Sequence, residues 1–266
     1  MAMKWSLNTY QTAQNWELDE LIRQAKAAGF DGIEFLMDFD QKHGVEANAD
    51  PAGLHTVKEK IDASGLEFAS VTSCASFHSL NDAERAEAMD RAAKSIRIAR
   101  DFGCQHVRVL GDRVPEDGTR ETVLENITHC MRELARQAQP DGITVSMEMH
   151  GSFTDPNLAV PLAEAVDMPN FGLVFNSQFR ENAQTGWRLP PDGSIRPLYD
   201  RFRPHLTQIH THQMERPDQL PMYQELFRLL KADGWNGYVA MEAAYTGPDP
   251  EKVLRLYTAL FHTLTA

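Results

Sequence analysis

Two glutamates end short apolar segments that have almost the same sequence. Residues 145–148 are Val-Ser-Met-Glu, and residues 239–242 are Val-Ala-Met-Glu. A strand buried on both faces has a nearly continuous run of hydrophobic residues, so each glutamate is expected where a strand leaves the core. Two unpaired buried carboxylates are costly unless a cation compensates them. Glu148 and Glu242 therefore predict one shared site rather than two isolated surface groups.

A histidine pair lies between these glutamates in the sequence. Residues 209–212 are Ile-His-Thr-His, and alternate residues of a strand face the same side. One histidine could then bind a ligand while the other supports it. The alternative is that both histidines are simply packed or exposed.

Carboxylate, amide and imidazole groups at the ends of the later strands suit Mn²⁺, Mg²⁺ or Co²⁺, and such a site also accepts Zn²⁺. A divalent ion of this kind would hold neighbouring oxygens of a polyol or ketose and acidify the proton on the carbon between them. Two glutamates near the ion could act as base and acid on opposite faces of that carbon. This is the chemistry of aldose–ketose isomerisation, or of epimerisation next to a carbonyl.

Short apolar segments alternate with longer amphipathic ones along the whole chain. Strands are predicted at 3–8, 32–37, 67–73, 106–110, 143–149, 172–176, 207–212 and 238–242. Helices are predicted at 16–28, 51–63, 82–102, 120–138, 157–166, 197–202, 220–232 and 250–264. Eight strand–helix pairs in about 250 residues predict an α/β fold, a single (β/α)₈ TIM barrel spanning residues 1–266. The alternative, a doubly wound open sheet, usually has a Gly-rich turn after its first strand, and residues 7–11 contain no glycine.

In such a barrel the active site forms at the carboxyl ends of the strands, so the polar residues at those ends are the candidates. Besides the glutamates and the histidine pair, these positions hold Asn8, Glu34, Cys74, His78, Arg108, Asp112, His150, Asn176, Gln178, Glu215 and Arg216. Glu34, His78 and His150 are expected to be substrate contacts or ordinary residues of the rim. His106 begins its strand at the opposite end and is expected to be structural.

Composition excludes several classes of partner. The formal net charge of the 266 residues is −12, which gives no general attraction to phosphate backbones or anionic lipid. We therefore expect neither a nucleic-acid nor a membrane partner, and no segment approaches the roughly 20 apolar residues of a membrane span. The three cysteines lack metal-knuckle spacing and predict free thiols in a reducing compartment. With no apolar leader segment near the start, a cytoplasmic protein is expected.

Several ordered motifs resemble the xylose isomerase-like barrel superfamily of sugar phosphate isomerases and epimerases. They are residues 28–34 (Ala-Gly-Phe-Asp-Gly-Ile-Glu), 99–109, 147–151 (Met-Glu-Met-His-Gly), 171–176, 209–212 and 237–242. The resemblance runs nearly end to end and implies a TIM barrel that acts on a small sugar, polyol or keto acid. It also allows a homo-oligomer, since members of this group are often dimers or tetramers.

The resemblance implies a divalent metal, with Mn²⁺ the first choice, held by a residue from each of the last four strands. By position these ligands correspond to Glu148, Asn176, His212 and Glu242, and the two glutamates are also the expected catalytic pair. This sequence departs from the usual pattern at Asn176, where an aspartate is common, and at Phe179, where a histidine or asparagine is common. Losing one negative charge should weaken metal binding, raise the Lewis acidity of the ion, or indicate a site that works without metal.

Two further substrate contacts are expected from these positions. Gln178 could replace a ligand or contact the substrate, and Arg216 corresponds approximately to a substrate-binding arginine of the superfamily. No Gly-rich phosphate cradle is present, which favours a substrate without phosphate.

Four functions remain to be compared. The first is metal-dependent isomerisation or 3-epimerisation, with dehydration or β-elimination as a second reaction on the same scaffold. The second is a metal-independent isomerase of the hydroxypyruvate type, in which the glutamates act alone. A DNA repair nuclease would need a His-rich zinc rim and a basic groove, which the net charge opposes. A sugar-binding barrel without catalysis is the fourth, because Asn176 changes the expected ligand set.

Overall fold

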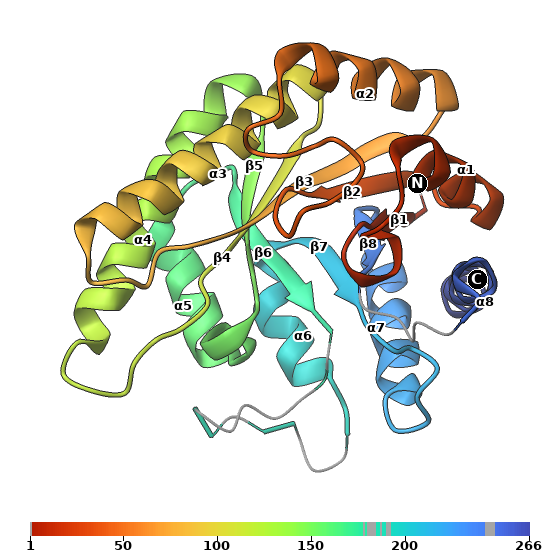
Figure 1. Ribbon diagram of the computed structural model, residues 1–266. Coiled ribbons are helices and arrows are strands. Elements are labelled where there is room, and N and C mark those ends of the chain that lie inside the picture. Colours follow the sequence, from red (N-terminus) through yellow and green to blue (C-terminus); the bar gives the residue numbers. More distant parts are fainter. Residues whose placement is uncertain (1, 178, 180–184, 187, 190–192, 243–247) are drawn as a thin grey trace.

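The computed structural model describes residues 2–266 except 178, 180–184, 187, 190–192 and 243–247. Eight parallel strands form a closed barrel in the order β1 to β8 (Figure 1). The strands are β1 (Lys4–Asn8), β2 (Gly32–Leu36), β3 (Glu67–Ser76), β4 (His106–Leu110), β5 (Thr144–Glu148), β6 (Phe171–Asn176), β7 (Leu206–Thr211) and β8 (Tyr238–Met241). The predicted (β/α)₈ barrel is confirmed, and β8 closes it by pairing with β1.

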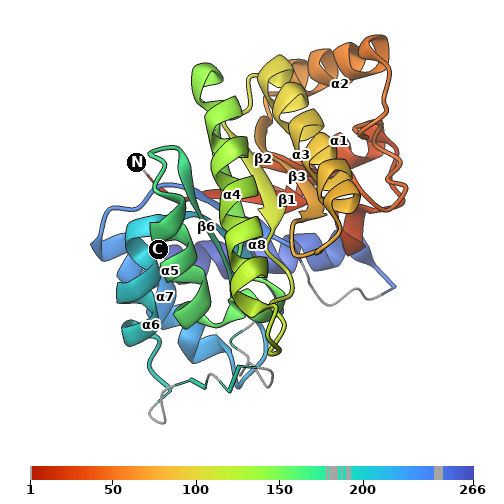
Figure 2. The ribbon, with the colours of Figure 1, turned by 90° about the vertical axis from the view of Figure 1, so that its left-hand side faces the viewer.

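Helices cover the outside of the barrel (Figures 1 and 2). They are α1 (Leu18–Ala28), α2 (Pro51–Ser64), α3 (Asp82–Phe102), α4 (Arg120–Ala138), α5 (Pro156–Val166), α6 (Arg196–Phe202), α7 (Leu220–Ala232) and α8 (Pro250–Thr265). Each helix follows its strand as predicted. The boundaries of the helices either agree with the predicted ones or differ from them by one or two residues. Among the helices described here, none combines the length and the apolar composition that crossing a membrane requires.

Local sequence signals fix where the helices begin. The Asp50 carboxylate accepts the backbone N–H groups of Ala52 and Gly53, both at 2.9 Å, and Pro51 occupies the first turn of α2. Asn81 caps α3 and Asp155 caps α5 in the same way. A side-chain oxygen at the N-cap satisfies N–H groups that have no partner within the helix. These caps set the start of the helices and hence the length of the loops that carry the rim of the barrel.

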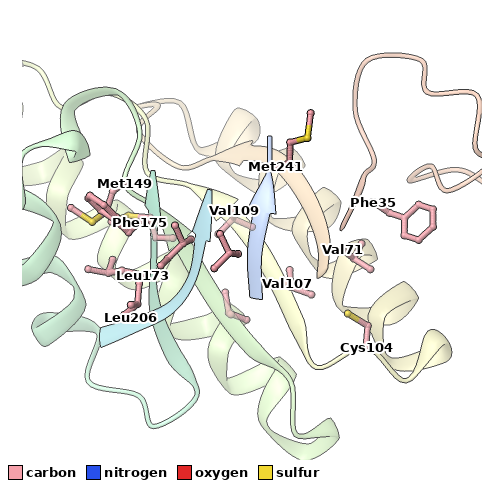
Figure 3. Close-up of a cluster of buried hydrophobic side chains, with 14 of the residues drawn as sticks. Phe35, Val71, Cys104, Val107, Val109, Met149, Leu173, Phe175, Leu206 and Met241 are labelled. Carbon is pink, nitrogen blue, oxygen red and sulfur yellow. The ribbon is translucent and has the colours of Figure 1, made fainter. Parts of the chain in front are cut away.

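The main apolar core lies between the barrel and the helices. On β1 the fully buried Trp5 stacks against Phe261 of α8, with ring centroids 4.5 Å apart. On β6 the ring of Phe175 stacks against Phe202 of α6 at 4.3 Å. Figure 3 shows part of this core, including Phe175. Since successive residues of a strand face opposite sides, the neighbours of these outward-facing residues point into the barrel.

The interior of the barrel is mostly polar. The buried inward positions include Ser6, Asn8, Glu34, Ser70, Thr72, Arg108, Ser146, Glu148, Asn176, Gln208 and His210. Their contacts cross the barrel: the Gln208 amide donates to the Ala69 carbonyl at 3.2 Å, and the His210 ring lies 3.0 Å from the Glu34 carboxylate. TIM barrels are usually filled by branched apolar side chains, so this interior is adapted to hold charge.

Candidate active site

Strand register brings the two glutamates to the same end of the barrel. Glu148 is the last residue of β5, and it pairs in register with Leu110 of β4 and Val174 of β6. Glu242 directly follows β8, where its backbone N–H bonds the Thr211 carbonyl at 3.2 Å. Both glutamates are buried, with 2% and 8% of their surface exposed. The expectation that they meet in one site is therefore correct in geometry.

Arg108 of β4 lies between the two glutamates. Its Nε atom is 3.1 Å from Glu148 Oε2, and its terminal nitrogen is 3.7 Å from Glu242 Oε1. The guanidinium also donates to the Ser73 carbonyl at 3.1 Å. Arg108 is only 3% exposed, so it supplies the site with a fixed positive charge.

His210 of β7 contacts the same oxygen atoms of these two carboxylates. Its Nδ1 atom lies 3.2 Å from Glu242 Oε1 and 3.6 Å from Glu148 Oε2. Its Nε2 atom lies 3.0 Å from Glu34 Oε1, and Glu34 also accepts a hydrogen bond from the Asn8 amide. His210 therefore connects three buried glutamates.

This network favours the charged forms of His210, Glu148 and Arg108. Burial lowers the pKa of His210, but the negative charges of Glu34, Glu242 and Glu148 outweigh it and raise the pKa well above its ordinary value. Burial raises the pKa of Glu148, but the positive charges of Arg108 and His210 bring it below its ordinary value. Burial also acts to lower the pKa of Arg108, and the charge of Glu148, with smaller contributions from other acidic groups, raises it overall. Opposite charges within a few ångströms favour the ionised state of both partners.

Asn176 and His212 contact the opposite oxygens of the two glutamates. The Asn176 amide nitrogen donates to Glu148 Oε1, and its oxygen lies 2.7 Å from His212 Nε2. The same His212 nitrogen is 3.5 Å from Glu242 Oε2. The four residues expected to bind metal thus form one continuous chain of contacts.

Each glutamate consequently has an inner oxygen and an outer oxygen. The inner oxygens, Glu148 Oε2 and Glu242 Oε1, face Arg108 and His210. The outer oxygens, Glu148 Oε1 and Glu242 Oε2, face Asn176 and His212. We call these two sets of contacts the inner side and the outer side of the glutamate pair.

The outer side has a donor set that fits a divalent ion. It offers two carboxylate oxygens, one amide oxygen and one imidazole nitrogen, which is the mixture that Mn²⁺, Mg²⁺, Co²⁺ or Zn²⁺ accepts. A second grouping is also close: Glu148, His210 and Glu242 each offer a ligand atom, and all three atoms lie within 4.8 Å of one another. Both groupings share the two glutamates, so this group of residues could hold a metal.

The glutamate pair opens into a cavity of about 970 Å³. Of the residues expected to bind substrate, His150 and Arg216 line this cavity. Arg216 also pairs with Asp218 at 2.7 Å. Gln178 lies outside the described residues.

Two expected substrate contacts occupy different places. Glu34 is fully buried and contacts His210 and Asn8 beneath the glutamates. His78 is half-buried in the loop after β3. Neither residue is among the described residues that line the cavity.

The loops after β4 and β5 are locked together at the rim. Asp112 has a left-handed backbone with φ 62°, and its carbonyl accepts the Ser152 N–H at 2.8 Å. Gly151 also has positive φ, and a Cβ atom there would lie 2.4 Å from the Asp112 carbonyl oxygen. The Asp112 carboxylate is 3.6 Å from His150 Nδ1. The close approach requires a glycine at 151, and it fixes His150 at the edge of the cavity.

The sequence placed Arg108 and His210 at strand ends, but it did not predict that they contact Glu148 and Glu242. The signal was present, because an arginine between Val107 and Val109 must face the opposite side of β4 from two core residues. Charge alone did not reveal its partners, since pairing of β4 with β5 brings Glu148 to Arg108, and closure of the barrel brings Glu242 to it.

A comparison against protein families agrees with the fold. The family described as xylose isomerase-like TIM barrel matches residues 22–257. The chain belongs to this family of (β/α)₈ proteins.

Solved structures with the same fold include several enzymes. A 3-keto-D-glucoside 4-epimerase from E. coli is 17% identical, with a TM-score of 0.77, covering 98% of this chain and 99% of that one. A D-allulose 3-epimerase from Methylomonas sp., in complex with D-allulose, is 15% identical with a TM-score of 0.76, covering 98% and 97%. A probable 3-DHS dehydratase from Bacillus anthracis is 15% identical, with a TM-score of 0.72, covering 98% and 99%. A sequence comparison with curated proteins gave no significant match.

Proposed function

We propose that this protein is a divalent-metal-dependent isomerase or epimerase of a small sugar, polyol or keto acid. It moves a proton on a carbon next to a carbonyl, with Glu148 and Glu242 as the base and acid. The observation that carries the proposal is the division of each glutamate into an inner oxygen held by Arg108 and His210 and an outer oxygen facing the ligand set. This arrangement supplies two oriented carboxylates at the floor of one cavity.

The chain's own residues divide the work between the two sides. Arg108 and His210 contact the inner oxygens of both glutamates and fix their direction, so that neither has to reorganise when a substrate binds. Glu148, Asn176, His212 and Glu242 are the proposed metal ligands, with Mn²⁺ the first choice. When bound, the ion would polarise the substrate carbonyl and lower the pKa of the neighbouring C–H group. One glutamate accepts that proton, and the other returns a proton to the carbon or to the oxygen.

The named structural relatives guide the choice between isomerisation or epimerisation and dehydration. Two of them are sugar epimerases, and the third is a probable dehydratase. We therefore place isomerisation or epimerisation first, and dehydration second. At this level of identity the fold supports the reaction class and leaves the sugar open.

The experiment follows the C–H proton directly. The protein, loaded with Mn²⁺, is incubated in D₂O with D-allulose, D-fructose, D-tagatose and L-ribulose, and NMR monitors deuterium entering next to the carbonyl. We expect deuterium incorporation that EDTA abolishes and Mn²⁺ restores. Glu148→Gln and Glu242→Gln should each slow it about 10²- to 10⁴-fold, the usual contribution of a positioned acid or base.

A matched control uses an exposed glutamate on an outer helix. Glu121, in the first turn of α4, is exposed, and Glu121→Gln should exchange deuterium at the wild-type rate. Equal rates for wild type and both site variants would remove the proposal. Release of water in place of exchange would assign the dehydratase reaction.

A metal-independent isomerase of the hydroxypyruvate type is the second candidate. It is favoured by Arg108, a buried cation that contacts both glutamates, and by the uncharged Asn176 in the ligand set. In this reaction the guanidinium would balance the negative charge that develops on the substrate oxygen. Turnover of hydroxypyruvate that is unchanged by EDTA would select this candidate over the first.

A further inference from the structure

From the wall of the cavity at the ends of β1 and β2 we infer a second subsite, which takes the aromatic aglycone of a glycoside. Tyr10, Leu36 and Phe39 form this wall, and we call it the apolar wall. The inference rests on the proposed function, because it assumes that the reacting sugar lies at Glu148 and Glu242. It adds the class of substrate: a glycoside whose sugar ring keeps a carbonyl group, as the proposed reaction requires, and whose aglycone is aromatic.

The cavity has a polar part and an apolar part. The ends of β5 to β8 contribute carboxylate, amide and imidazole groups to one part, whereas the end of β2 and the loops after β1 and β2 contribute the apolar wall to another. A volume of about 970 Å³ is near the upper end of the roughly 300–1,000 Å³ found for pockets that hold drug-sized ligands. A single small sugar occupies only part of such a volume, so the cavity has room for a substituent.

Phe39 is held at this wall in an unfavourable state. Its side chain is 55% exposed, and its backbone φ is 67°. The next residue, Asp40, also has a positive φ of 55°. Bulky residues rarely adopt this conformation, and such strain persists where the surrounding structure enforces it, commonly at ligand sites.

Neighbouring groups enforce this position. The Gln14 amide donates to the Phe39 carbonyl at 3.1 Å. The Tyr10 ring lies beside the Phe39 ring, with centroids 6.1 Å apart and planes tilted by 42°. The backbone N–H of Tyr10 is held by the side chain of Asn8 at 2.8 Å. Two aromatic rings are thus presented on the mouth of the cavity from two connected loops.

The chemistry of this wall selects an aromatic ring over a second sugar. Offset or edge-to-face packing satisfies a flat aromatic group, and it removes the exposed face of Phe39 from water. A second sugar would bring several hydroxyl groups that need hydrogen-bond partners, and of the three side chains of the wall only Tyr10, through its hydroxyl, can supply one. The apolar wall therefore fits an aryl group joined to the sugar at the glutamates.

Calorimetry with defined probes tests the subsite without requiring turnover. The Mn²⁺-loaded protein is titrated with phenyl and methyl β-D-glucosides, and with phenyl and methyl β-D-galactosides. We expect the phenyl member of at least one pair to bind about tenfold more tightly than its methyl partner, from burial and stacking of one ring. Phe39→Ala should remove this preference and leave the methyl glycosides unchanged.

Leu256 provides a matched control, because it is 58% exposed on the outer helix α8. Leu256→Ala should retain the full preference for the phenyl glycosides. Equal affinity within both pairs, no detectable binding of either phenyl glycoside at millimolar concentration, or a preference that survives Phe39→Ala would each overturn the subsite. If the preference holds while deuterium exchange is absent, the subsite stands and the proposed reaction fails.

Discussion

Two buried histidines in this protein have opposite electrostatic surroundings. His210 inside the barrel is 0% exposed, and His43 in the loop after β2 is 1% exposed. Glu34, Glu148 and Glu242 surround His210 and raise its pKa. His43 packs edge-on against the Phe35 ring at 5.1 Å, with Thr9 as a hydrogen-bond partner, and burial lowers its pKa to about 4.

The comparison shows that burial alone does not decide whether a group is charged. In the pocket around His43, desolvation is opposed only by a weaker backbone hydrogen bond, so the neutral ring is favoured. Inside the barrel, three carboxylates outweigh a similar desolvation. The interior of the barrel is therefore a region where the fold maintains ions, which is costly for stability and useful for chemistry.

Removing the cation at Arg108 should break this balance most strongly. Arg108→Met leaves Glu148 and Glu242 without their fixed counter-charge, and we expect the free energy of unfolding to fall by about 3–5 kcal/mol. Arg108→Lys keeps the charge but loses the planar fork, so its loss should be smaller. Urea denaturation at pH 7.5 measures both. A methionine variant as stable as wild type would show that the interior does not depend on this charge.

Lowering the pH should reduce the stability of the folded protein through the buried, neutral His43. Its pKa is about 4 in the folded protein and about 6.5 in an unfolded chain, so the unfolded state binds more protons between these values. Stability from this group is fully present above pH 6.5 and is lost as the pH falls toward 4, by an amount of about 3 kcal/mol. His43→Asn should reduce this loss, seen as a shallower decrease in urea midpoint from pH 6.5 to 4. An unchanged pH dependence in the variant would contradict the assignment.

Restoring a charge on the outer side should have the smallest of these effects. Asn176→Asp adds a carboxylate to the ligand set, and we expect Mn²⁺ to bind about tenfold more tightly, since affinity follows the charge of the ligands. Calorimetry with Mn²⁺ alone measures the change. Asn157→Asp adds the same charge at an exposed position on α5 and serves as the control. Equal gains in the two variants would mean that Asn176 is not a ligand.

The order and type of the elements could be predicted because their signals are local. Caps such as Asp50 and the alternation of apolar segments depend on neighbours within a few residues. The predicted ranges 82–102, 106–110 and 120–138 agree with the boundaries of α3, β4 and α4. The range 220–232 likewise agrees with α7, the end of β3 moved by three residues, and the ends of the other elements moved by one or two.

The site was partly predictable for the same reason. Glu148, Asn176, His212 and Glu242 stand at strand ends, and the structure brings them into contact. Their roles as ligands and catalysts remain predictions. The expectation that Glu34 faces substrate did not anticipate its contact with His210, because that contact joins β2 to β7 across the barrel.

The sequence by itself determined the repeated strand–helix units, the inward direction of alternate strand residues, and the placement of carboxylates at strand ends. Only the tertiary structure decided which charges meet: closure of β8 onto β1 places Arg108 between glutamates that are 94 positions apart (242 minus 148). Local propensities act over a few residues, whereas electrostatic pairing depends on distances in space. Folding sets those distances, and with them the opposite states of His210 and His43.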